Sequence, residues 1–111
     1  LLDAKAIQDY SLPNTDRLNM INNYIPNFNE LLLKFNHKNL NLSFVSYVAS
    51  SINHNSDIEK WCTQISKKSN NIPVSVISAD DLAKLALKYK GKINYDEVLK
   101  IFSKTGVIQL N

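Results

Sequence analysis

The residues best suited to chemistry lie at the start of the chain, where Asp3 and Lys5 are separated by one residue within an apolar run. Side chains alternate across a β-strand, so on a strand these two would project from one face, while Leu2, Ala4 and Ala6 would face the opposite side. A carboxylate is a hard oxygen ligand for a divalent cation, and an ammonium can orient water or stabilise charge on a phosphate. This is the chemistry of metal-dependent phosphodiester cleavage. The spacing alone is a weak signal for it and favours an ordinary pair on an exposed strand, which many proteins carry by chance.

The composition is that of one globular domain of 111 residues. The chain is 44% apolar and 21% charged, with only two Gly and three Pro, which excludes a disordered tail. No apolar run reaches the roughly 20 residues of a membrane-spanning helix. The chain has no initiating Met and begins inside a predicted strand, so we expect residues 1–111 to be a single domain that was cut from a longer protein.

The other chemically interesting residues favour ordinary structural roles. A single cysteine, Cys62, excludes an internal disulfide and indicates a reducing intracellular setting, and its helical apolar spacing predicts a packed thiol. His37 and His54 are too few for a zinc cluster and are expected at the surface. The net charge of +3 permits an acidic partner. A cluster of lysines either follows a phosphate backbone or forms a solvated face: Lys84, Lys88, Lys90 and Lys92.

A loop that ends at Pro13 follows the first strand, and a helix is expected to begin near Thr15 or Asp16. Apolar residues then recur at steps of three and four, which is the spacing of one helical face. This stripe either packs in the core or forms a dimer seam. It comprises Leu18, Ile21, Ile25, Phe28, Leu32 and Phe35.

Pro26 lies within this stripe and is expected to interrupt the helix. Asn27 followed by Glu30 has the pattern of a capping box. We therefore expect two helices, or one sharp kink, with the second helix starting near Asn27.

The middle of the chain predicts a buried strand over 42–49 and another over 74–77, both rich in β-branched or aromatic residues. Between them, Ser56 and Glu59 form another capping-box pattern ahead of a helix that ends near Ser69. Its buried face is expected to comprise Ile58, Trp61, Cys62 and Ile65. Strands that alternate with helices suggest parallel neighbours joined by right-handed crossovers, which is an α/β fold.

The last third of the chain contains the same helix-capping pattern twice, a cap residue followed three positions later by an acid. The two pairs are Ser78 with Asp81 and Asn94 with Glu97. Two short helices are expected, with Gly91 ending the first and 107–110 forming an edge strand or tail. The buried positions are expected to be Leu82, Leu85, Ala86 and Tyr89 in the first helix, and Val98, Ile101 and Phe102 in the second.

These parts occur in an order that resembles a known family. The strand Asp3-Ala4-Lys5-Ala6, the segment Tyr10-Ser11-Leu12-Pro13 before a helix, and Phe44-Val45-Ser46 in a core strand resemble the second half of a FokI-like type IIS restriction endonuclease cleavage domain. Segments 76–82 and 92–98, with Phe102, resemble that family's closing strand and acid-capped helices. The resemblance covers nearly the whole chain.

The resemblance implies part of the PD-(D/E)XK nuclease core, an α/β fold with a mixed sheet flanked by helices. By this resemblance Asp3 and the backbone carbonyl of Ala4 are ligands of catalytic Mg²⁺. Lys5 would position the attacking water or stabilise charge on the phosphorane. The family's upstream acids have no counterpart in these residues.

Two further positions follow from the resemblance. Asp16 stands where the related domain has a polar amide, and no role can be assigned to it from sequence. The helix over 16–25 corresponds to one that family members use to dimerise, so Leu18 and Asn22 are candidate positions of a dimer interface.

The leading hypothesis is therefore a fragment of a Mg²⁺-dependent type IIS restriction endonuclease that cuts double-stranded DNA in the bacterial cytoplasm. It would act as a transient homodimer, away from membranes, and would need the upstream remainder of its own polypeptide, so the fragment alone is expected to be inactive. One alternative is another PD-(D/E)XK nuclease, either a repair or a transposon-encoded enzyme. The other is a non-catalytic interaction domain in which Asp3 and Lys5 form an ordinary surface ion pair.

Overall fold

The computed structural model describes residues 1–35, 42–90, 92 and 94–110, and its centre is a four-stranded sheet. Neighbouring strands lie in the order β1-β2-β3-β4, and all three pairs are parallel. The α/β class predicted from sequence is confirmed. In the described part of the chain the sheet is uniformly parallel, where a mixed sheet was expected, because each connection between strands crosses back over the sheet. The strands are β1 (Leu2–Lys5), β2 (Val45–Ala49), β3 (Val74–Ser78) and β4 (Gly106–Ile108).

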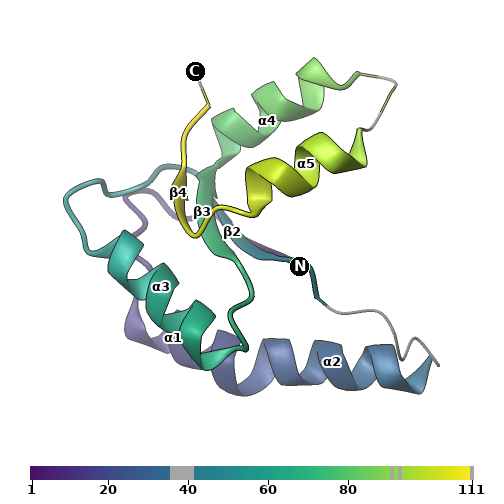
Figure 1. Ribbon diagram of the computed structural model, residues 1–111. Helices are drawn as coiled ribbons and strands as arrows, with labels where there is room; N and C mark the ends of the chain where they lie inside the picture. Colours follow the sequence, from purple (N-terminus) through teal and green to yellow (C-terminus); the bar gives the residue numbers. More distant parts are fainter. Residues whose placement is uncertain (36–41, 91, 93, 111) are drawn as a thin grey trace.

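Helices cover both faces of this sheet (Figure 1). On one face lie α1 (Asn14–Asn19), the π-helical segment η1 (Met20–Tyr24), α2 (Ile25–Lys34) and α3 (Ile58–Lys68). On the other face lie α4 (Ala79–Lys88) and α5 (Tyr95–Phe102). Because side chains alternate along each strand, the sheet contributes to two separate apolar clusters. Tyr47 and Val76 belong to the first cluster, with Met20 and Cys62, whereas Ile77 belongs to the second, with Leu85 and Phe102.

The strand register places the first residues of the chain relative to the core. Asp3 lies beside Tyr47, and Tyr47 lies beside Val76, so these three side chains project toward the layer of α1 and α3. Lys5 projects from the same face as Asp3, and Leu2 and Ala4 are exposed on the opposite face. The predicted alternation along the first strand is therefore confirmed.

The helical layer from α1 to α2 differs from expectation at Pro26. The backbone N–H of Ile25 donates to the carbonyl of Met20, five residues earlier, which is the hydrogen bond of a π-helix. α2 begins at Ile25 with Pro26 in its first turn, so the predicted helix start near Asn27 is wrong. Pro26 has no N–H and its ring would clash with the carbonyl four residues before it, and the wider π-turn relieves that clash.

The predicted caps of the last two helices are confirmed. The hydroxyl of Ser78 accepts a hydrogen bond from the Asp81 N–H at 3.1 Å, and the side-chain carbonyl of Asn94 accepts one from the Glu97 N–H at 3.3 Å. Each bond satisfies one of the donors left free at a helix start.

The capping box expected at the start of α3 is wrong. The Ser56 hydroxyl instead donates to the carbonyl of Asn53 at 2.6 Å, and the N-cap position is Asp57, whose side chain makes no capping bond. The carboxylate of Glu59 accepts a hydrogen bond from the Val107 N–H at 3.0 Å. Glu59 therefore connects α3 to β4, a contact between segments that are far apart in the sequence.

Burial confirms most of the predicted core positions. Cys62 is completely buried and His54 is exposed, as predicted, whereas His37 and Gly91 lie outside the described residues. Ala86 is exposed, contrary to the prediction, because α4 packs on the sheet through Leu85 and the half-buried Leu82. In the described residues no helix is long and apolar enough to cross a membrane.

Candidate active site

Three charged side chains meet at the end of β1. Asp3 and Lys5 come from the strand itself, and Asp16 comes from the first turn of α1. The ammonium of Lys5 lies 3.2 Å from Oδ2 of Asp3 and 3.6 Å from Oδ1 of Asp16. All three side chains are mostly shielded, with exposed fractions of 16% to 21%. One ammonium is therefore shared between two carboxylates in a partly dehydrated setting, where charges interact more strongly than in water.

The Asp3 carboxylate is not fully satisfied by the protein. Its Oδ2 atom is buried, and among the described residues its polar contact is the ion pair with the Lys5 ammonium at 3.2 Å, without a further hydrogen-bond donor. A buried carboxylate oxygen without a partner is costly, so such an atom fits a site that is completed by another group. A divalent cation is one group that this hard oxygen donor suits.

The described residues do not form a complete metal site. Within the ranges that the structure describes, no group of three or more His, Cys, Asp or Glu side chains lies close enough to hold an ion. The side chain of Ala4 points to the opposite face of the sheet, so only the backbone of Ala4 is available to this face.

Asp16 is held in place by two tyrosines of the core. The hydroxyl of Tyr10 donates to Oδ2 of Asp16 at 2.6 Å, and the hydroxyl of Tyr47 donates to the Asp16 backbone carbonyl at 3.3 Å. The two rings are buried, with centroids 6.1 Å apart. Burial, followed by the hydrogen bond to Asp16, raises the pKa of Tyr10 above its ordinary range. Burial followed by the charge of Asp3 does the same for the pKa of Tyr47. Both hydroxyls therefore remain donors at neutral pH.

The loop after β1 brings these groups together. The Tyr10 N–H donates to the carbonyl of Ser51, and the Asn53 N–H donates to the carbonyl of Tyr10, both at 3.0 Å, so the loops after β1 and β2 run side by side. Asp9 and Leu12 adopt positive φ values of 52° and 56°, although neither is a glycine. Such conformations persist where the surrounding structure imposes them, and they are concentrated at functional sites.

Arg17 attaches this end of α1 to α3. Its guanidinium donates to the Leu12 carbonyl and to the Asn14 side chain, each at 3.2 Å, and lies 3.7 Å from the centre of the Trp61 ring. These contacts fix the first turn of α1, and with it the position of Asp16, relative to the rest of the fold.

The electrostatic environment keeps Lys5 charged. Burial alone would lower the pKa of Lys5, but the adjacent Asp3 carboxylate and the charge of Asp16 outweigh burial and raise the pKa above its usual value. Lys5 is therefore an ammonium at neutral pH, able to stabilise negative charge.

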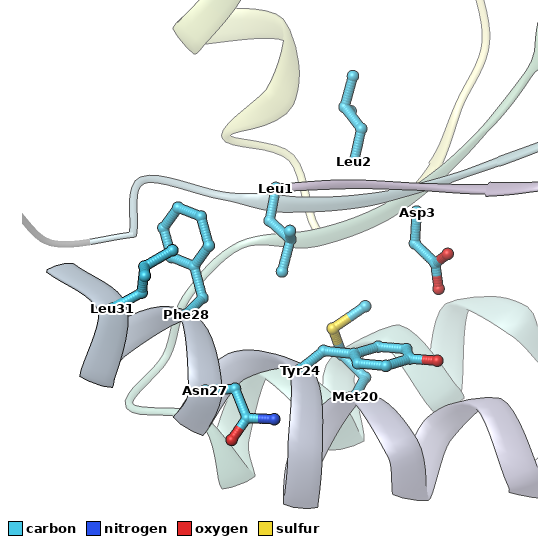
Figure 2. Close-up of a pocket in the computed structure, with 8 residues that line it drawn as sticks. All are labelled: Leu1, Leu2, Asp3, Met20, Tyr24, Asn27, Phe28 and Leu31. Carbon is cyan, nitrogen blue, oxygen red and sulfur yellow. The ribbon is translucent and has the colours of Figure 1, made fainter.

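An apolar pocket of about 370 Å³ lies between β1, η1 and α2, next to Asp3. Figure 2 shows Leu1 and Asp3 pointing from the strand toward the helices, with the Tyr24 ring on the side of Asp3 and Phe28 on the side of Leu1. The apolar walls place nonpolar groups on one side of the Asp3 carboxylate, which strengthens its interaction with any cation.

Sequence reasoning identified Asp3 and Lys5 as neighbours on one face but missed the group that joins them to the helical layer. Nothing in the spacing of Asp16, Tyr10 and Tyr47 indicates that their polar groups meet. The candidate dimer positions are accessible, since Leu18 is 46% exposed and Asn22 is also exposed.

Comparison with known protein families finds a match over nearly the whole chain. The family model described as FokI, cleavage domain, matches residues 1–109, which includes all four strands and every helix described above. No curated protein and no solved structure matches the chain.

Proposed function

Because the chain belongs to the FokI cleavage-domain family, the nuclease domains of type IIS restriction endonucleases, we propose that it hydrolyses phosphodiester bonds of double-stranded DNA with Mg²⁺. The observation that carries this proposal is the buried Oδ2 of Asp3, which lies 3.2 Å from the Lys5 ammonium and has no hydrogen-bond donor to it among the described residues. A hard oxygen donor and a fixed positive charge are the two groups that cleavage of a phosphodiester requires at one place.

The proposed roles follow from the chemistry of each group. Asp3 and the backbone carbonyl of Ala4 would hold Mg²⁺, which when bound polarises a phosphate oxygen and makes water a better nucleophile. The Lys5 ammonium would stabilise the negative charge that develops on the phosphorane and orient the attacking water. Tyr10 and Tyr47 take no part in the reaction and maintain the fold around it.

We propose that the remaining metal ligands belong to an upstream part of the same polypeptide. Mg²⁺ takes about six oxygen ligands in near-octahedral geometry, and one carboxylate with one carbonyl would bind it weakly even with several waters. β1 is the first strand in the order of the sheet, so among the described residues one of its edges is unpaired, and a further strand there would lie next to Asp3. The 111-residue chain alone is accordingly expected to cut DNA poorly or not at all.

The test is a plasmid cleavage assay on the longer polypeptide, with Asp3→Asn and Lys5→Ala compared with Asp80→Asn, an exposed acid on α4. Lys5→Ala is expected to reduce the single-turnover cleavage rate by about 10²- to 10³-fold while DNA binding stays nearly unchanged. Asp3→Asn should lose cleavage through weaker metal binding, and excess Mg²⁺ or Mn²⁺ should partly restore it. Asp80→Asn should behave as the wild type.

Two outcomes would contradict the proposal. Full activity in Lys5→Ala would remove the catalytic role of the ammonium, and cleavage that persists in the presence of a chelator would remove the role of the metal. Efficient metal-dependent cutting by the isolated 111-residue chain would contradict the need for upstream ligands while leaving the assignment of a nuclease intact.

A further inference from the structure

We infer that Asp16 is a positioning residue, which holds the Lys5 ammonium in place beside Asp3 through a second carboxylate contact. The importance of Asp16 for cleavage rests on the proposed function, whereas the contact between Asp16 and Lys5 is observed in the structure. The distances from the Lys5 ammonium are 3.2 Å to Asp3 and 3.6 Å to Asp16, so neither carboxylate alone defines its position.

A lysine needs such a second anchor at this place. Its side chain is long and has several rotatable bonds, so a single contact fixes the ammonium poorly. Asp3 alone would also hold Lys5 poorly, because the same atom, Oδ2 of Asp3, contacts Lys5 and is the proposed ligand of a cation. A cation at Asp3 would attract the same carboxylate and repel the ammonium. With Asp16 present, Lys5 keeps one negatively charged partner whatever Asp3 binds.

Asp16 differs from Asp3 in being held by the protein itself. Its Oδ2 accepts the short hydrogen bond from Tyr10, and its backbone carbonyl accepts the one from Tyr47, leaving Oδ1 as the atom that faces Lys5. Tyr10 and Tyr47 are 1% and 0% exposed, so they cannot move without disturbing the core. A carboxylate oriented by buried donors can in turn orient the ammonium, as supporting residues do around functional groups.

A purely architectural role for Asp16 predicts different results. If Asp16 served only to bind Tyr10 and Tyr47, Asp16→Asn would be nearly silent, because an asparagine carbonyl can still accept from Tyr10 and the backbone carbonyl is unchanged. Only the negative charge facing Lys5 would be lost. Asp16→Asn therefore separates the two roles, and Tyr10→Phe gives the complementary variant, in which the charge remains but loses the donor that orients it.

The first measurement needs no catalysis. In the ¹⁵N-labelled 111-residue chain, the ammonium signal of Lys5 is assigned by its disappearance in Lys5→Arg. Its hydrogen exchange with water is then compared with that of exposed lysines such as Lys100. The wild-type signal should exchange severalfold more slowly than that of Lys100. Asp16→Asn should bring the two rates together, Tyr10→Phe should have an intermediate effect, and Asp80→Asn should have none. An unchanged Lys5 signal in folded Asp16→Asn would overturn the inference.

The second measurement follows cleavage under single-turnover conditions in the longer polypeptide. Asp16→Asn should slow the cleavage step by about 10- to 100-fold, since a misplaced catalytic group loses that much, with DNA affinity unchanged. Asp16→Glu, which keeps the charge, should recover part of the rate. Wild-type cleavage by Asp16→Asn would overturn the inference. A wild-type protein that never cuts DNA would refute the proposed function alone, because the ammonium exchange still decides whether Asp16 positions Lys5.

Discussion

Two aspartates share one lysine in this site, and their surroundings give them different tasks. Asp16 has its Oδ2 occupied by the Tyr10 hydroxyl at 2.6 Å, whereas the buried Oδ2 of Asp3 has no hydrogen-bond partner in the described part of the chain. A satisfied carboxylate is suited to hold its neighbours, and an unsatisfied one is suited to take a ligand. The proposed roles, metal binding for Asp3 and positioning for Asp16, are therefore distinguished by hydrogen bonding, because both residues carry the same functional group.

The buried hydroxyls and the buried thiol predict a loss of stability in alkaline solution. In the folded protein burial raises the pKa of Cys62 to about 12 and the pKa values of Tyr10 and Tyr47 above their ordinary range. In the unfolded chain the same groups ionise near about 8.5 for cysteine and 10 for tyrosine. The unfolded state therefore releases protons first as the pH rises, so the free energy of unfolding should fall by roughly 3 kcal/mol between pH 8 and pH 10, mostly through the cysteine.

Urea denaturation at pH 7, 8, 9 and 10 measures this effect. The pH-dependent loss should begin near the pKa of an unfolded cysteine, and stability should be nearly constant from pH 7 to pH 8 as far as these three groups are concerned. Cys62→Ala is the comparison variant. It should be less stable at pH 7 because of the cavity it creates, yet lose less stability on going to pH 10. A wild-type stability that stays constant up to pH 10 would show that these groups are more hydrated than their burial implies.

At the scale of elements, periodicity and local caps could be predicted from sequence because they depend on residues a few positions apart. Ser78 and Asn94 cap α4 and α5 as their spacing indicates. The same pattern failed at Ser56, because its hydroxyl bonds a loop carbonyl and Glu59 bonds β4 instead. A capping motif indicates which local hydrogen bonds a side chain can make. It does not indicate whether a residue far away in the sequence competes for the same atom.

The contact between α3 and β4 leads to a prediction for Gly106. This glycine has a φ of 123°, which side chains rarely adopt, and a Cβ atom added to it would overlap the carboxylate of Glu59. Gly106→Ala should therefore lower the free energy of unfolding by about 2 kcal/mol, through backbone strain and displacement of Glu59 from the Val107 N–H. Urea denaturation of the variant at neutral pH measures the change.

A double-mutant cycle separates the two causes. Glu59→Ala removes the carboxylate, so the double variant should be more stable than the sum of the two single effects implies, and the remaining loss reports backbone strain. Additive effects would mean that the carboxylate moves aside without cost. Glu59→Gln serves as the control for charge, because its amide oxygen can still accept from Val107.

At the scale of the whole molecule, the site depends on contacts that no local pattern encodes. The α/β order of elements follows from alternating strand and helix signals, but the register that puts Asp3 beside Tyr47 joins segments 44 positions apart along the chain. Parallel pairing makes such separations unavoidable, because every connection must cross the sheet. The meeting of Tyr10, Asp16 and Tyr47 therefore required the structure, whereas the pairing of Asp3 with Lys5 required only the two-residue period of a strand.

The layers also separate Lys84 and Lys88, two members of the predicted lysine cluster, from the site. Lys84 and Lys88 lie on α4, which covers the face of the sheet opposite to that of Asp3 and Lys5 (Figure 1). Lys84 is 65% exposed and lies 3.7 Å from Asp81 on its own helix. Of the two interpretations of the lysine cluster, a solvated face fits this arrangement better than a phosphate-binding surface continuous with the site.

The face of α1 and η1 that points away from the sheet leads to the last prediction, that the intact enzyme cuts both DNA strands as a transient homodimer. Leu18 is 46% exposed, Asn22 is exposed, and α1 buries none of its residues, so both positions can meet a second copy and tolerate substitution. In a two-fold symmetric contact each substitution occurs twice, so Leu18→Glu with Asn22→Glu would place like charges against each other. Double-strand cleavage should then slow by about tenfold or more.

Cleavage measured over a range of enzyme concentrations decides whether the dimer forms. The rate per enzyme molecule should rise with concentration in the wild type and should rise less in the charged variant, while first-strand nicking changes little. Leu87→Glu is the matched control, because Leu87 is 71% exposed on α4, and circular dichroism of each variant checks that the fold is intact. A wild-type rate per enzyme that is independent of concentration would contradict the dimer, since only an association step makes the activity of each molecule depend on the presence of the others.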